Sequence, residues 1–261
     1  MIDKPDEHRR MFAVEEQLWW YRHLHNLVLA CIQRRFGQRK DLAVFDAGCG
    51  TGGLLHRLQQ QEYTNLRGVD GSEEGVACCR ERGLTVDRLN LNQLGTYAPA
   101  DLTTATFDVI ICNDVFCYFN DLELQILLNE LGRRLRPGGV LISNNNAFAV
   151  FKGEHDLAVG SLRRFVRADF DRLVPTAGLR IASSLYWSLL LSPLILLVRQ
   201  WQALQLRLGW RSADQPASDV ELPHPLVNGI LYKLVSTEQK LITSAPFGSS
   251  LFLEMEPGAG N

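Results

Sequence analysis

A glycine-rich turn at residues 44–53, with the sequence VFDAGCGTGG, constrains the fold more than any other segment. Its apolar run predicts a buried strand that ends near Asp46, and the glycines that follow allow a sharp turn into a helix. These glycines are Gly48, Gly50, Gly52 and Gly53. The unpaired N–H groups of such a helix face a ligand, and Asp70, twenty positions after Gly50, can accept hydrogen bonds from ribose hydroxyls. The pattern therefore predicts a site for a nucleoside-containing cofactor.

Short apolar runs alternate with helical patterns along most of the chain. This alternation predicts an α/β fold with a parallel sheet that is covered by helices on both faces. Two further apolar runs towards the C-terminus predict a sixth and a seventh strand. The seven expected strands span residues 43–46, 66–70, 84–89, 107–113, 140–143, 179–185 and 250–255.

Helical periodicity is clearest in two segments. Residues 15–36 carry apolar side chains at helical spacing, and a leucine stripe predicts a second helix from Asp121. The stripe comprises Leu124, Leu127, Leu128, Leu131 and Leu135. Asn120 or Asp121 is the expected N-cap, and the Pro-Gly-Gly sequence at 137–139 is the expected end. A polar segment follows the fifth strand, and a helix is expected near residues 168–174.

The expected domain organisation has three parts. Residues 1–40 form an N-terminal helical cover, and residues 41–185 with 246–261 form the main domain. About sixty residues separate the last two expected strands, far more than a hairpin loop needs. Residues 186–245 are therefore expected to form a helical insertion or cap, with a polar loop at 212–225.

The insertion begins with an apolar stretch. Residues 181–198 contain no charged side chain, but four serines and Pro193 interrupt them. A membrane span needs about twenty predominantly apolar residues, so a buried cap helix is the favoured interpretation. An in-plane membrane contact through residues 186–208 and a membrane span are the alternatives.

Composition narrows the functional class. The formal net charge of −2, with Lys and Arg spread along the chain, argues against a nucleic-acid partner. Six cysteines without a CxxC pair or a zinc-type His spacing indicate reduced thiols and no metal site. The charged first ten residues do not resemble a secretory signal, so we expect a cytoplasmic protein, with membrane association as an alternative. No pattern indicates the oligomeric state.

Two cofactors fit the glycine turn. Gly48, Gly50 and Gly53 also satisfy GxGxxG, the dinucleotide fingerprint, so an NAD(P)-dependent oxidoreductase is one alternative. Asp46 lies two residues before the first of these glycines, where a carboxylate favours an ammonium group and repels a pyrophosphate. A ligand with an amino acid at one end and adenosine at the other fits this charge better.

Four motifs, in this order and spacing, resemble those of the class I S-adenosylmethionine-dependent methyltransferases, type 11 domain family. They are FDAGCGTGG (45–53), GVDGS (68–72), FDVIICNDVFCYFND (107–121) and LRPGG (135–139). HD at 155–156, RRF at 163–165 and PFGSS at 246–250 resemble one bacterial subfamily. The resemblance implies a Rossmann-like sheet of seven mostly parallel strands with an antiparallel last strand.

With the apolar insertion, this resemblance predicts methyl transfer from S-adenosylmethionine to a small-molecule or lipid-like acceptor. A non-catalytic binding protein that keeps the fold is a further alternative. The resemblance implies that the cofactor contacts Trp20, Arg22, Asp46, Gly48, Cys49, Gly50, Gly52, Asp70, Gly71, Ser72, Asn90, Leu91 and Asn113. Asp70 would hold the ribose, while Asn90 and its neighbour would contact adenine. Arg22 can bind the cofactor carboxylate, and aromatic faces attract a sulfonium.

Candidate catalytic residues lie after the fourth and fifth strands. His155 is the best candidate for a general base, and Asp156 could orient it; a solvated surface histidine is the alternative. Tyr118 is a second candidate, at a position where relatives often have histidine. Arg163 and Arg164 are expected either to bind an acceptor carboxylate or phosphate or to lie on an exposed turn.

Overall fold

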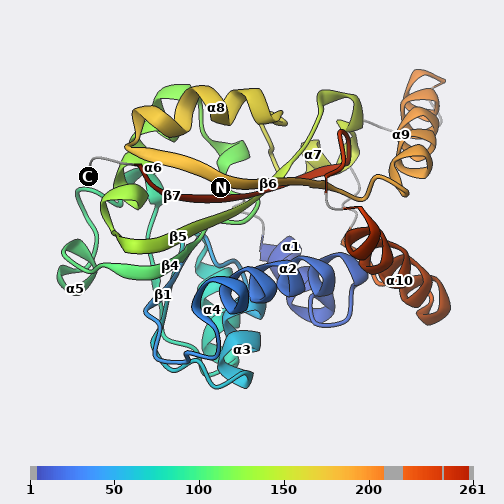
Figure 1. The fold of residues 1–261 in the computed structure, drawn as a ribbon. Helices are drawn as coiled ribbons and strands as arrows, with labels where there is room; N and C mark the ends of the chain where they lie inside the picture. The colour runs from blue at the N-terminus through green and yellow to red at the C-terminus, as the bar shows by residue number, and fades with distance from the viewer. Residues whose placement is uncertain (1–4, 209–219, 243, 259–261) are drawn as a thin grey trace.

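Seven strands form one sheet in the order β3-β2-β1-β4-β5-β7-β6 in the computed structural model, which describes residues 5–208, 220–242 and 244–258 (Figure 1). The strands are β1 (Val44–Ala47), β2 (Leu66–Asp70), β3 (Val86–Arg88), β4 (Phe107–Ile111), β5 (Leu135–Asn146), β6 (Leu179–Trp187) and β7 (Ser250–Pro257). Strands β1 to β5 pair in parallel, whereas β7 is antiparallel to both β5 and β6. The predicted Rossmann-like α/β fold with an antiparallel last strand is confirmed.

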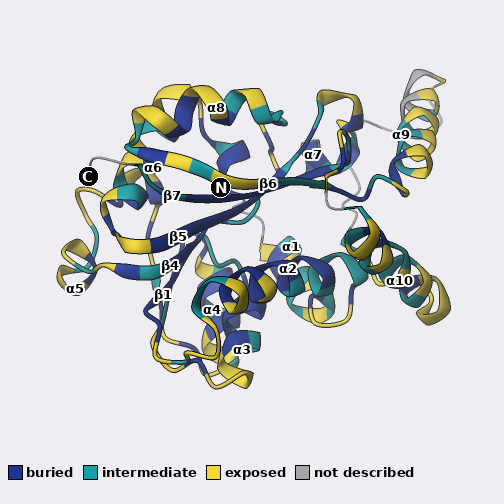
Figure 2. Ribbon diagram, in the orientation of Figure 1, coloured by how far each residue is buried: buried dark blue, intermediate teal, exposed yellow. Residues whose placement is uncertain are grey.

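Helices cover both faces of the sheet (Figure 1). They are α1 (Pro5–Val14), α2 (Trp19–Phe36), α3 (Gly53–Gln60), α4 (Glu73–Glu81), α5 (Ala100–Thr103), α6 (Asp121–Arg133), α7 (Glu154–Ala158), α8 (Arg167–Thr176), α9 (Ser192–Arg207) and α10 (Pro225–Leu241). Successive strand residues point to opposite faces, so Val44 packs in one core with α2 while Phe45 packs in the other with α6. Figure 2 shows the burial concentrated in the sheet and on the helix faces towards it.

The N-terminal segment forms two helices where one was predicted. The predicted helix at 15–36 begins at Trp19, and a separate helix α1 precedes it. A turn at residues 15–18 joins them. Glu15, placed at the helix start by the sequence pattern, lies in this turn and is buried. Helix α1 lacks an apolar stripe of its own, so periodicity did not reveal it.

Helix α6 ends earlier than its leucine stripe predicted. Asn120 caps its start through a reciprocal capping box with Glu123, as the sequence indicated. The helix stops at Arg133, because Leu135 pairs with Phe107 in the sheet and begins β5. Pairing with β4 thus overrides the helical spacing, and the Pro-Gly-Gly sequence lies inside the strand.

The apolar stretch of the insertion divides between a strand and a helix. Strand β6 continues to Trp187, whose buried indole N–H donates to Asn144 Oδ1 at 2.9 Å. Helix α9 starts only at Ser192, next to Pro193, and α10 follows the segment 209–219, which lies outside the described residues. The predicted polar loop at 212–225 is therefore described only from Val220. Among the helices that the structure describes, none combines the length and the hydropathy that a membrane span requires.

Candidate active site

A cavity of about 500 Å³ opens at the carboxyl ends of β1, β2, β4 and β5. Helices α1 and α2 border one side, and α9 with the loop before α10 borders the other. The predicted site residues that line it are Trp20, Asp46, Gly48, Cys49, Gly50, Asp70, Asn113, Tyr118, His155 and Arg164. The edge of a parallel sheet where the strand order reverses is the usual ligand position of such folds.

Backbone conformation explains the glycines of the turn. Gly48, Gly50 and Gly52 have φ angles of 91°, 56° and 79°, which side chains disfavour. A Cβ atom at Gly48 would lie 2.5 Å from Val115, and one at Gly50 would lie 2.8 Å from Met11. The turn therefore keeps bare backbone at the cavity wall.

Asp70 joins the tip of β2 to the glycine turn. Its carboxylate accepts hydrogen bonds from the backbone N–H of Gly50 at 2.9 Å and of Ser72 at 2.8 Å. Burial raises the pKa of Asp70 above its ordinary value, although these two bonds oppose the shift. The carboxylate lies in the cavity wall at the end of the second strand, where the sequence placed it.

Asp46 is a buried carboxylate with no hydrogen-bond donor among the residues that the structure describes. Its side chain is only 4% exposed and lines the cavity. Burial, together with the negative charges of Asp70 and Glu15, raises the pKa of Asp46 to about 8. A cationic ligand group would relieve this cost, whereas a pyrophosphate would add to it. This buried carboxylate therefore fits a cofactor that carries an ammonium group.

Glu15 is a second buried carboxylate of the cavity, and the sequence did not indicate it. It accepts hydrogen bonds from Thr51 Oγ1 at 2.5 Å and from Arg82 at 2.7 Å. Burial raises the pKa of Glu15 to about 7, although both partners oppose the shift. These contacts attach the turn after α1 to the glycine turn.

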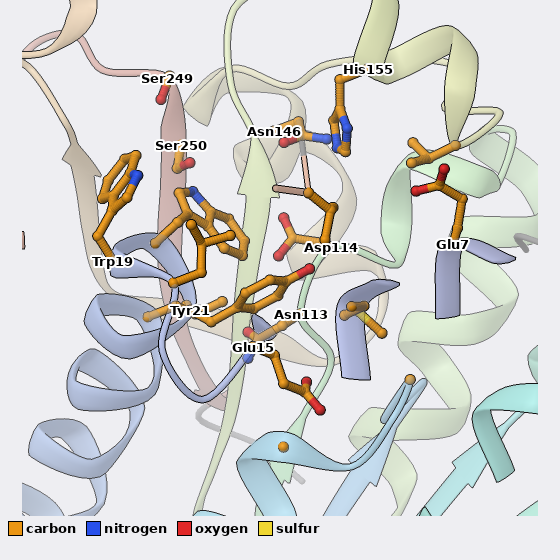
Figure 3. A pocket seen from close by; sticks show the side chains of 18 of the residues that line it. Glu7, Glu15, Trp19, Tyr21, Asn113, Asp114, Asn146, His155, Ser249 and Ser250 are labelled. Carbon is orange, nitrogen blue, oxygen red and sulfur yellow. The ribbon is translucent and has the colours of Figure 1, made fainter. Parts of the chain in front are cut away.

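Asp114 is a third cavity carboxylate absent from the sequence prediction. Its φ of 56° is unusual for a residue other than glycine, and both its oxygens accept from Asn144 Nδ2, at 3.0 and 3.2 Å. Burial raises the pKa of Asp114 to about 7. Figure 3 shows Asp114, Asn146 and His155 projecting into the same part of the cavity. Its position directly after Asn113, at the end of β4, was the signal that could have identified it.

Two predicted candidates for acid–base chemistry lie in the cavity wall. His155 projects from the short helix α7 (Figure 3). Tyr118 is partly buried beside the core, and burial raises the pKa of its hydroxyl. Asp156 does not serve His155 as expected, because its carboxylate accepts from Arg164 at 2.9 and 3.0 Å and from the Gly153 N–H.

The two predicted acceptor-binding arginines are engaged within the protein. Arg164 reaches the cavity, but its guanidinium is held by Asp156 and by the Ala147 carbonyl. Arg163 does not line the cavity; it forms an ion pair with Asp121 and lies over the Phe165 ring at 4.7 Å.

Six predicted cofactor residues are not among the lining residues: Arg22, Gly52, Gly71, Ser72, Asn90 and Leu91. Arg22 stacks on the Tyr232 ring of α10 at 4.1 Å. Ser72 caps α4, and Asn90 caps the short turn that follows β3. The side chains of Arg22, Ser72 and Asn90 thus contact the protein itself.

The sheet order and the glycine turn define a class of α/β domains that bind nucleoside cofactors at the strand-order reversal. The antiparallel β7 between β5 and β6 separates this chain from the dinucleotide-binding order of six parallel strands. Residues 44–139 match the family described as "Methyltransferase domain". Over these residues the chain is similar to methyltransferase domains.

Curated relatives are distant. The chain is 27% identical over 132 residues to the carboxy-S-adenosyl-L-methionine synthase of Photobacterium profundum. The aligned region covers 48% of this chain and 53% of that protein. It is 24% identical over 117 residues to the ubiquinone biosynthesis O-methyltransferase of Rickettsia bellii, covering 45% and 47% of the two chains. The chain thus spans about half the length of these relatives.

A solved structure shares the fold over most of the chain. A putative sarcosine dimethylglycine methyltransferase from Galdieria sulphuraria superposes with a TM-score of 0.56 at 12% identity, covering 91% of this chain and 86% of that one. At this identity the likeness concerns the fold alone.

Proposed function

We propose that this protein is an S-adenosylmethionine-dependent methyltransferase that acts on a small-molecule or lipid-like acceptor. The observation that carries the proposal is the buried Asp46 carboxylate, which lies beside bare glycine backbone without a donor in the described part of the chain. The family of residues 44–139 and the two relatives, whose names refer to S-adenosylmethionine or to O-methylation, support the same cofactor.

The cofactor, when bound, supplies a methyl group on a sulfonium. Asp46 and the backbone of Gly48 and Gly50 would hold its methionine end, and Asp70 its ribose hydroxyls. Trp20 and Tyr21, from the start of α2, offer aromatic faces on the cavity side to a cationic centre. The acidic wall therefore favours the positively charged donor over its neutral product.

The acceptor would occupy the part of the cavity between α7 and α9. This part is mainly apolar, with Phe151, Val159, Leu191, Ile195 and Leu231 in its wall. We propose that the N-terminal helices and the inserted helices act as a cover and a cap that exclude water. Alignment of a nucleophile behind the methyl group then supplies most of the rate, about 7 to 11 kcal/mol of the barrier.

Polar side chains in the same cavity would remove the proton from a hydroxyl or amine acceptor. His155 is the base predicted from the sequence, and Asp114 meets the same requirement because its pKa of about 7 suits a base at neutral pH. Tyr118 would contribute a hydrogen bond through its hydroxyl.

Ligand-dependent thermal stability tests the cofactor assignment. Saturating S-adenosylhomocysteine is expected to raise the Tm, whereas NADH is expected to leave it unchanged. The reverse result would favour the oxidoreductase alternative. Incubation of a cell extract with methyl-labelled S-adenosylmethionine, followed by phase separation, then assigns the acceptor to the lipid or the aqueous fraction. Cofactor binding without labelled product in either fraction would favour a non-catalytic protein.

A further inference from the structure

Helices α9 and α10 project from one end of the molecule and carry apolar residues on their outer faces (Figures 1 and 2). The exposed residues of α9 and its end recur at intervals of three and four, so they form one stripe along the helix. They are Leu194, Leu197, Trp201, Leu204 and Leu208, each more than 40% exposed. On α10, Leu226, Ile230 and Leu241 are 72%, 65% and 77% exposed.

The opposite face of α10 is anchored to the protein by polar contacts. Asn228 accepts from the Trp19 N–H and donates to the Gln17 carbonyl, both at 2.8 Å. Glu238, only 3% exposed, accepts from the backbone N–H groups of Leu189 and Leu190 at 2.9 and 2.7 Å. The helix therefore buries these polar anchors together with Val235, and it directs several large apolar side chains outwards, where a water-facing helix is mostly polar.

The exposed charged side chains of α10 are positive. Lys233 and Lys240 are exposed on α10, on the same face as Leu226, Ile230 and Leu241. The only acidic residue of α10 is the buried Glu238, and the sequence of α9 contains none. A surface of exposed leucines with lysines, on a chain of net charge −2, complements an anionic bilayer.

The apolar stripe continues into the cavity. Leu194 and Val198 are 54% and 44% exposed and also line the cavity wall. Leu231 contributes to the same wall from α10. The cavity therefore borders the exposed apolar surface of α9.

We propose that α9 and α10 dock the protein, in plane, on a lipid bilayer that carries anionic headgroups. An amphiphilic acceptor then passes from the bilayer into the cavity along Leu194 and Val198. This second step rests on the proposed methyl transfer, whereas docking does not. The proposal specifies the lipid alternative for the acceptor of that site.

Cosedimentation of the full chain with vesicles tests the docking. We expect binding to phosphatidylcholine vesicles that contain phosphatidylglycerol, weaker binding at high salt, and little binding to phosphatidylcholine alone. The double variant Leu197→Gln/Leu204→Gln, at positions outside the cavity wall, should bind about ten-fold more weakly or worse. The double variant Lys233→Gln/Lys240→Gln should lose roughly five-fold for each lysine on the anionic vesicles alone.

A matched control removes equally exposed apolar residues elsewhere. Leu122 and Ile126 on α6 are 71% and 51% exposed, and α6 lies at the other end of the sheet from α9 (Figure 1). Leu122→Gln/Ile126→Gln should bind vesicles like the unmodified protein. Equal loss in this control, or no binding of the unmodified protein to any vesicle, overturns the proposal. So does a dimer that Leu197→Gln/Leu204→Gln converts to a monomer without vesicle binding, since this face then joins two copies.

The S-adenosylhomocysteine Tm shift, measured on the same preparations, separates the two proposals. A Tm shift without vesicle binding rejects docking alone, and vesicle binding without a Tm shift rejects the proposed function alone. For acceptor entry, Leu197→Gln/Leu204→Gln should reduce labelling of extracted lipids in vesicles but not in detergent. Equal labelling in both rejects entry from the bilayer.

Discussion

Arg82 donates a hydrogen bond to Glu15 at 2.7 Å, across 67 positions of the sequence. Both side chains are nearly buried, at 6% and 5% exposure, and Arg82 also donates to the Thr51 carbonyl at 3.1 Å. One guanidinium thus joins the N-terminal turn to the glycine turn that borders the cavity. The pair therefore holds the turn between α1 and α2 against the glycine turn.

The Arg82→Ala variant should lower the free energy of unfolding by about 3 kcal/mol, because Glu15 would remain buried without its partner. Urea denaturation measures the change. Arg88→Ala, which breaks an exposed pair with Glu73, serves as the control and should change stability by less than about 1 kcal/mol. Adding Glu15→Gln to Arg82→Ala should restore part of the lost free energy of unfolding. If Arg82→Ala and Arg88→Ala lowered the stability equally, the buried pair would not be what stabilises this turn.

The Asp70→Asn variant should weaken S-adenosylhomocysteine binding at least about ten-fold, because the carboxylate is assigned to both ribose hydroxyls. Isothermal titration calorimetry gives the Kd. Asp87→Asn on β3, which pairs with Arg67 away from the cavity wall, should bind as the unmodified protein does. Unchanged affinity in Asp70→Asn would show that the ribose assignment is wrong.

Binding of S-adenosylmethionine should strengthen as the pH rises from about 6 to 8.5. Since burial raises the pKa of Asp46 to about 8, the free protein carries a neutral Asp46 at lower pH, and a cationic ligand favours the ionised form. Binding then releases a proton below pH 8 and none well above it. Calorimetry in buffers of different ionisation enthalpy measures this release.

The Asp46→Asn variant provides the comparison for this pH dependence. It should bind more weakly at pH 8.5 and lose most of the dependence on pH. If the unmodified protein and the variant followed the same pH profile, another group would be responsible. Glu15 is the first alternative, because its pKa is raised to about 7.

The Asp114→Asn variant should lower the rate of methyl transfer about 100-fold, while its Kd for S-adenosylhomocysteine changes less than about three-fold. The amide preserves the shape of the side chain but cannot take the acceptor proton at a pKa near 7. Transfer of labelled methyl groups in a cell extract gives the rate. A larger loss in His155→Gln than in Asp114→Asn would assign the proton to His155 instead, and Tyr118→Phe should have the smallest effect of the three.

Local patterns anticipated much of the fold. The strand before Gly48 and the capped start of α6 depend on neighbouring residues, and both were predicted. The predicted end of α6 was wrong. Leu135 has helical spacing in the sequence, but it pairs with Phe107 in the sheet and so belongs to β5. Element boundaries fail where a partner strand, distant in sequence, competes for the same residue.

The site divides in the same way. Asp46, the glycine turn and Asp70 belong to segments whose spacing alone implies a strand end, a tight turn and a second strand end, so the sequence by itself placed them together at one edge of the sheet, where they line the cavity. The tertiary structure alone added Glu15 and Asp114, since their burial and partners come from segments far along the chain.

Tertiary structure also decided which partners the candidate side chains have. Arg22 was predicted to bind the cofactor carboxylate and Arg164 an acceptor anion, yet Arg22 stacks on Tyr232 and Arg164 is held by Asp156. The leucines of α9 and α10 showed in the sequence that these segments are apolar, but not whether the side chains point into the protein or away from it. The contacts of Glu238, Asn228 and Tyr232 with the rest of the protein determine which face of α10 is turned outwards, because orientation follows from contacts and not from composition.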